Sequence, residues 1–116
     1  MLGSVTRKLN RDSGERKALF RDLVSAVITH GRIETTVAKA KETKKITDSL
    51  VDLALRGDVH ARRQARRLLT DPAVVKRLFT EVAPKFQRGR GGYTRVIRTR
   101  TRRGDASDMA IVELVS

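Results

Sequence analysis

The chain of 116 residues has no cysteine, no tryptophan, only two histidines and only four aromatic side chains. Without cysteine, a disulfide framework, a thiolate zinc site and a cysteine nucleophile are excluded. The shortage of aromatic residues argues against base stacking as the main way of binding a nucleic acid. No apolar run approaches the roughly 20 residues of a membrane-spanning helix. The first residues also lack the apolar stretch of a secretory signal peptide.

Acidic residues are scarce relative to basic ones. The chain has 26 Lys and Arg residues against 13 Asp and Glu residues, which gives a formal net charge of +13. Such a protein repels copies of itself and is attracted to polyanions. Nucleic acid is the first candidate partner, and an anionic membrane surface is the second.

Local signals predict the order of the secondary structure. Asp12 with Glu15 three residues later forms a capping-box pattern, Gly31 is a stop signal, Asp58 is a cap, and Asp71-Pro72 is another start signal. Thr35 or Thr36 is expected to cap the second helix. The predicted helices span residues 12–30, 37–56, 59–69 and 72–82, and the predicted strands span 32–37, 93–99 and 109–115.

These elements predict an α+β fold with two layers in a single domain. About four helices pack on a small three-stranded sheet, either mixed or antiparallel. Residues 109–115 are apolar on both faces except at Glu113, so we expect them to form the central strand. We expect residues 1–11 to form a basic N-terminal arm and residues 12–116 to form a single α+β domain.

The positive charge is concentrated in a few segments. Residues 85–103 contain eight basic residues and no acid, and residues 56–67 contain five arginines against Asp58. Lys39 and Lys41 lie in the first turns of the second helix, where the helix dipole disfavours cations, so a ligand would explain them. Arginine predominates over lysine in these clusters, which favours bidentate recognition of phosphate over simple solubility. A solvated basic surface with no specific ligand is the competing interpretation.

No catalytic pattern is present, so we expect the protein not to be an enzyme and to use no cofactor, metal or small-molecule substrate. The serines lie in no nucleophile motif, and the acids are scattered as caps and surface partners. For Tyr93, stacking on a base and packing on the sheet are both open.

Several short strings follow one another at a characteristic spacing. They are Lys8-Leu9-Asn10-Arg11, Arg32-Ile33-Glu34-Thr35-Thr36, Ala38-Lys39-Ala40-Lys41-Glu42, Arg56-Gly57-Asp58-Val59-His60-Ala61-Arg62-Arg63, Gly91-Gly92-Tyr93-Thr94-Arg95, Arg102-Arg103-Gly104-Asp105 and Met109-Ala110-Ile111-Val112-Glu113-Leu114-Val115. In this order they resemble the bacterial-type large-subunit ribosomal protein seventeen family, from about residue 7 to residue 115. Leu2 to Thr6 depart from the short basic stretch that is common in that family, and Asp108 stands where the family often has proline.

The resemblance implies a structural protein that binds large-subunit ribosomal RNA near the nascent-peptide exit, beside neighbouring large-subunit proteins. It implies a bacterial cytoplasm, or an organelle with bacterial-type ribosomes, and a role in ribosome assembly and translation. From the resemblance and the basic clusters together, the predicted RNA-binding residues are Arg7, Lys8, Asn10, Arg11, Arg16, Thr35, Thr36, Lys39, Lys41, His60, Arg62, Arg63, Arg66, Arg88, Arg90, Gly92, Tyr93, Thr94, Arg95, Arg98, Arg100, Arg102 and Arg103.

Two other functions are open on the sequence. The short helices 59–69 and 72–82 resemble a helix-turn-helix of a DNA-binding protein, although the connection Thr70-Asp71-Pro72 lacks the glycine often found in such turns. Attachment to a membrane surface has weaker support, because helix 59–69 has too few apolar residues for an interfacial anchor.

Overall fold

The computed structural model describes residues 13–86 and 92–115. In chain order the elements are α1 (Ser13–His30), β1 (Arg32–Thr36), α2 (Val37–Arg56), α3 (Val59–Leu68), α4 (Pro72–Arg77), the π-helical turn η2 (Leu78–Val82), the 3-10 turn η3 (Ala83–Lys85), β2 (Thr94–Thr101) and β3 (Asp108–Leu114). The predicted α+β class is confirmed, and the sheet is antiparallel. The division into an arm and one domain stays a prediction.

The three strands have the order β1-β3-β2, so β3 is the central strand as predicted. Antiparallel pairing aligns Ile33, Val112 and Val96 across the three strands, and the adjacent row aligns Arg32, Glu113 and Arg95. Because side chains alternate along a strand, these two rows lie on opposite faces. The first row faces the core beneath the sheet, and the second row faces solvent.

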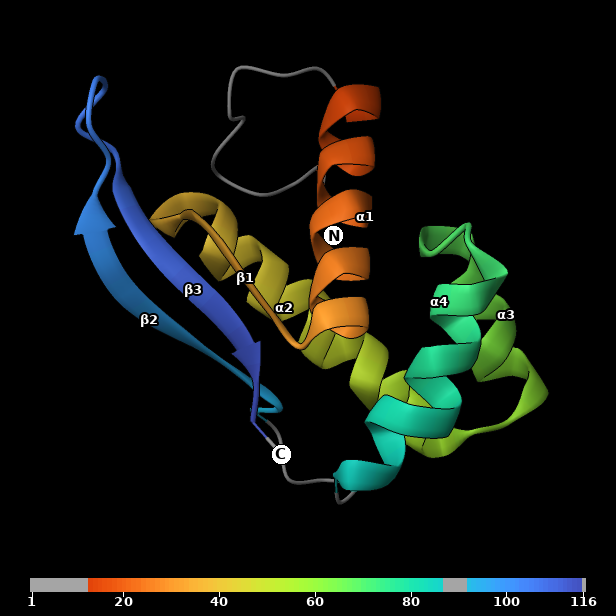
Figure 1. The fold of residues 1–116 in the computed structure, drawn as a ribbon. Helices are drawn as coiled ribbons and strands as arrows, with labels where there is room; N and C mark the ends of the chain where they lie inside the picture. Colours follow the sequence, from red (N-terminus) through yellow and green to blue (C-terminus); the bar gives the residue numbers. More distant parts are fainter. Residues whose placement is uncertain (1–12, 87–91, 116) are drawn as a thin grey trace.

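One face of the sheet is covered by α1 and α2, and the outer face carries no helix (Figure 1). The core under the sheet contains Val27, Ala40, Ala110 and Val112. A second and larger core lies where α1 and α2 meet α3, α4 and η2, with Val24, Leu50 and Leu78 among its buried residues. Thus α3 and α4 extend the helical layer away from the sheet.

Most helix ends are where the local signals predict them. Gly31 and Gly57 have φ values of +86° and +70°, which only glycine adopts readily, and each directly follows a helix. Asp58 accepts a hydrogen bond from the Ala61 N–H at 2.7 Å, and Asp71 accepts one from the Ala73 N–H at 2.9 Å. Both aspartates therefore cap helices as predicted.

Three local predictions need correction, and one lies outside the described residues. Thr36 precedes α2 in the N-cap position, but its side chain makes no capping hydrogen bond. The fourth helix is α-helical only to Arg77 and continues as η2, where the Ala83 N–H bonds to the Leu78 carbonyl, and as η3, which contains Pro84. β2 extends to Thr101 rather than Thr99, since β3 pairs with it across an irregularity after Arg98. The cap predicted at Asp12 lies outside the described residues.

Candidate nucleic-acid interface

Most of the predicted contact residues that the structure describes fall into three groups, at the start of α2, along α3 and on the β2–β3 hairpin. Figure 1 places α3 on the right of the molecule and the hairpin on the left, with α1 and α2 between them. The described residues contain no cluster of three or more potential metal ligands. None of the described helices combines the length and apolar character needed to cross a membrane.

Helix α3 is held in place by small buried residues and by polar contacts at both ends. Ala61 and Ala65 are fully buried, so the helix packs closely on its neighbours. Asp58 caps its start, and Arg21 of α1 donates through Nε to the Leu68 carbonyl at 3.1 Å. These contacts fix the orientation of the opposite, exposed side of the helix.

That exposed side, called the α3 face below, consists of Arg62, Arg63, Arg66 and Arg67. Within the described chain, no carboxylate pairs with Arg63, Arg66 or Arg67. Arg62 lies over the ring of Phe79, 4.6 Å from its centroid. This cation–π contact holds the guanidinium in place without neutralising its charge. His60 is exposed on the same helix.

The hairpin presents a contrasting arrangement. Arg95 donates to Glu113 at 2.6 Å, and Arg100 lies 3.2 Å from Glu34 of β1. The other two arginines of this group also have acidic partners, Arg98 with Asp108 at 3.9 Å and Arg102 with Asp105 at 2.5 Å. Arg95, Arg98, Arg100 and Arg102 are called the hairpin arginines below.

Residues 85–103 contain no acidic residue, but in the folded chain carboxylates of β1, of β3 and of the turn between β2 and β3 lie beside their arginines. Glu113 is also 4.0 Å from Arg32, so it lies between arginines of both flanking strands. Hydrogen bonds from Thr99 and then Arg100 lower the pKa of Glu34 below its ordinary value of 4.5. Hydrogen bonds from Arg102 and the Ser107 N–H lower the pKa of Asp105, and the Asp105 carboxylate raises that of Arg102. Arg103 is exposed and has no acidic partner among the described residues.

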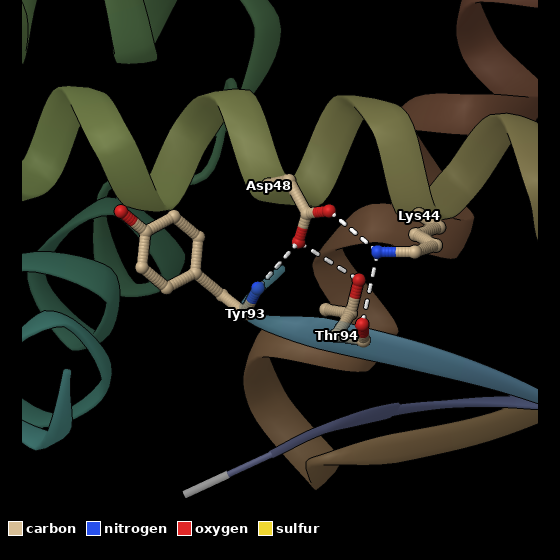
Figure 2. Close-up of polar contacts among 4 residues, drawn as sticks. All are labelled: Lys44, Asp48, Tyr93 and Thr94. Atoms are coloured by element: carbon tan, nitrogen blue, oxygen red, sulfur yellow. Dashed lines mark hydrogen bonds and ion pairs between the residues drawn. The ribbon is translucent and has the colours of Figure 1, made fainter. Parts of the chain in front are cut away.

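The start of β2 is fastened to α2 by a partly buried polar network (Figure 2). One Asp48 oxygen accepts from the Tyr93 N–H at 3.1 Å and from the Thr94 hydroxyl at 2.9 Å. The other accepts from Lys44 at 2.7 Å, and Lys44 also donates to the Thr94 carbonyl at 2.9 Å. Tyr93 is fully buried, packs edge-on against Phe86 and donates its hydroxyl to Asp52 at 2.5 Å.

These positions change the interpretation of several predicted contact residues. Of the two roles open for Tyr93, the structure shows packing, and Thr94 is 3% exposed. Arg16 on α1 is 6% exposed, and Thr35 faces the core. The side chains of these four residues are therefore covered in the folded chain. Gly92 is exposed and has a φ of +64°, which directs the chain into β2.

At the start of α2, Thr36 and Lys39 are half-buried and Lys41 is exposed. An open groove of about 430 Å³ runs from this helix start to the hairpin, and Lys41 and Arg98 line it together with Asp108. The sequence analysis predicted Lys41 and Arg98 as contact residues in separate segments, and the fold brings them to one groove. Arg7, Lys8, Asn10, Arg11, Arg88 and Arg90 lie outside the described residues.

The contact residues predicted from the sequence do not include Arg67 and Lys76, two basic residues that lie beside them in the fold. Arg67 lies one helical turn beyond Arg63, and the i, i+4 spacing was the available signal for it. Lys76 of α4 lines a groove of about 200 Å³ with Arg62 and Arg66. No local pattern singles out Lys76, since the packing of α4 against α3 alone brings it there.

Comparison with known proteins gives a consistent result. The family model described as ribosomal protein L17 matches residues 19–115. A protein of Symbiobacterium thermophilum is 55% identical over 109 residues, covering 94% of this chain and 96% of the relative. One from Clostridium acetobutylicum is 48% identical over 114 residues, covering 98% of this chain and all of the relative. One from Clostridium botulinum strain Loch Maree is 50% identical over 109 residues, covering 94% and 96%. Each relative is named large ribosomal subunit protein bL17.

Proposed function

Because the chain belongs to the ribosomal protein L17 family, we propose that it is a structural constituent of the large ribosomal subunit that binds and stabilises large-subunit ribosomal RNA. The family resemblance derived from the sequence strings is confirmed. The family consists of structural ribosomal components and not of enzymes, in agreement with the expectation from the sequence. The match over residues 19–115 is the observation that carries the proposal.

The distribution of charge supports RNA as the partner. The net charge of +13 favours a polyanionic partner. Arginines rather than lysines form the exposed α3 face. Neutralising phosphates with these cations releases counterions, which supplies a large part of the affinity. A-form RNA is recognised mostly through its shape, its phosphates and its 2′-hydroxyls, so base-reading side chains are not required.

The finer location is part of the same proposal. By the family resemblance, we place the protein near the nascent-peptide exit, among neighbouring large-subunit proteins. There it would support assembly and translation in a bacterial cytoplasm, or in an organelle with bacterial-type ribosomes. Chemical footprinting of the RNA with and without the protein tests this location. Protections scattered away from the exit would contradict it.

Co-sedimentation tests the function itself. Labelled full-length chain is added during reconstitution of large subunits, which are then sedimented through a high-salt cushion. We expect the chain to remain with the subunit. A chain that washes off completely and instead binds duplex DNA tightly would overturn the proposal and favour the DNA-binding alternative. The structure gives that alternative little support, because α4 has six residues and its Arg77 is held by Glu81 and the Ile28 carbonyl.

A further inference from the structure

We infer that the α3 face binds the phosphate backbone of the RNA and contributes more of the electrostatic attraction than the hairpin arginines do. This inference rests on the proposed function, since it assigns that function to one surface. It also adds Arg67 and Lys76 to the contact residues.

The spacing on α3 suits a polyphosphate. Arg62 with Arg66, and Arg63 with Arg67, are i, i+4 pairs, whose Cβ atoms are about 5–6 Å apart on a helix. The four arginines thus form two short parallel rows on the side opposite the buried Ala61 and Ala65. A planar guanidinium donates to phosphate in a bidentate manner, so each row can follow a run of phosphates.

The groove beside the first row extends the surface to α4. Arg62, Arg66 and Lys76 bring positive charge to its walls, while Pro72 and Val75 supply apolar contact. The contact of Arg62 with Phe79 keeps this guanidinium ordered before any ligand binds. Less conformational entropy is therefore lost when a phosphate enters.

Helix stability alone does not account for this arrangement. Cations in the last turn, such as Arg66 and Arg67, are favoured by the helix dipole. Arg62 and Arg63 lie nearer the start of the helix, where the dipole favours acids instead. Four adjacent arginines also repel one another, and a polyanion relieves that repulsion.

The hairpin arginines are electrostatically different. Four arginines there face four carboxylates, those of Glu34, Asp105, Asp108 and Glu113. A phosphate approaching them must displace a carboxylate or accept its repulsion. The α3 face imposes no such penalty within the described chain, because Arg63, Arg66 and Arg67 have no acidic partner there.

Two matched double variants of the full-length chain test the inference. Arg63→Gln with Arg67→Gln alters the α3 face, and Arg95→Gln with Arg100→Gln alters the hairpin. Each removes two exposed positive charges, so the change in net charge is the same in both variants. Binding to deproteinised large-subunit ribosomal RNA is measured by filter retention across a series of KCl concentrations. Circular dichroism checks that each variant is folded.

We expect the α3 variant to lower the log–log salt slope by about one to two units, since each lost phosphate contact changes it by about 0.7–0.9. The hairpin variant should change it by less than half as much. Equal changes, or a larger change in the hairpin variant, would overturn the inference while leaving the proposed function intact. Failure of the unaltered chain to bind the RNA would instead refute the proposed function. Unchanged RNA binding with lost incorporation into subunits would assign the α3 face to a protein neighbour and so also overturn the inference.

Discussion

The α3 face and the β2–β3 hairpin are both rich in arginine, but they differ in what surrounds those arginines. Along α3, a buried alanine stripe fixes the helix and leaves Arg63, Arg66 and Arg67 without acidic partners in the described chain. On the hairpin, each of the hairpin arginines has a carboxylate partner, which comes from β1, from β3 or from the turn between β2 and β3. The comparison teaches that a count of arginines does not measure the attraction of a surface for phosphate. The positions of the acids decide it.

The two regions also differ in how they are anchored. The hairpin depends on Asp48, through hydrogen bonds to Tyr93 and Thr94, whereas α3 depends on Asp58, on Arg21 and on packing. The following predictions use these anchors and charges to separate the regions.

The largest effect is expected from Asp48→Ala. This change leaves the Tyr93 N–H and the Thr94 hydroxyl without their acceptor, and Thr94 is almost completely buried. We expect a loss of roughly 1–3 kcal/mol in the free energy of unfolding, measured with urea. Hydrogen exchange should accelerate in β2 before it does in α3.

Tyr93→Phe is the matched control, because it removes the hydroxyl that donates to the exposed Asp52 and leaves the Asp48 acceptor in place. Its cost should be smaller than that of Asp48→Ala. If both variants cost the same, or if α3 exchanges first in Asp48→Ala, the separate anchoring of the hairpin is wrong.

The next effect concerns α3. Asp58→Ala removes the cap from the Ala61 N–H and should cost about 1 kcal/mol of the free energy of unfolding. Asp58→Asn keeps a capping oxygen and should cost a few tenths of that amount. Thermal unfolding measures both. Similar losses in the two variants would show that the charge of Asp58 near Arg56, rather than its cap, stabilises this end of the helix.

A third change tests whether the carboxylate partners weaken the attraction between the hairpin arginines and RNA phosphates. Glu113→Gln should release Arg95 and Arg32, with a stability cost of about 0–1 kcal/mol, as for other ion pairs of exposed arginines. We expect the salt slope of RNA binding to become steeper by about one unit. Glu81→Gln on η2 removes the same charge away from the hairpin and serves as the control. Equal salt slopes of RNA binding in Glu113→Gln and Glu81→Gln would show that Glu113 does not weaken the attraction between the hairpin arginines and phosphate.

The smallest effect is the acid titration of Glu34. Because the folded state lowers its pKa from 4.5, its contribution to stability is present above pH 4.5 and is lost as the pH falls through the lower, folded-state pKa. Carbon NMR of the carboxyl group should show a midpoint below 4.5. Thr99→Val and Arg100→Gln should each raise that midpoint, since Thr99 and then Arg100 donate the hydrogen bonds that lower the pKa of Glu34. A midpoint at or above 4.5 in the unaltered chain would contradict the hydrogen bonds that Thr99 and Arg100 of β2 donate to Glu34 of β1.

Much of the fold was predictable because its signals are local. The bounds 37–56 of the second helix are confirmed, and the stops at Gly31 and Gly57 depend on a few neighbouring residues. The central place of β3 followed from its apolar character on both faces. The π-helical turn η2 was not predictable in this way, since it depends on how the chain accommodates Pro84 and the core contacts of Leu78.

The candidate site was predicted less completely. The exposed arginines of α3 and the hairpin were identified from composition. The burial of Thr94 and Arg16 was not identified, and that of Tyr93 was only one of two open roles, because the same polar residue types occur on surfaces and in satisfied interior networks. Lys76 was missed because α4 is brought beside α3 by packing.

By itself, therefore, the sequence determined a basic α+β protein of the ribosomal protein L17 family, with its helix ends and its arginine-rich segments. These properties are encoded in single strings of residues. Tertiary structure alone decided which arginines have acidic partners among the described residues. The pairs that restrain the hairpin join residues as far apart in the chain as Glu34 and Arg100, or Arg95 and Glu113. Coulomb interaction depends on distance in space, and strand pairing sets that distance without regard to separation along the chain.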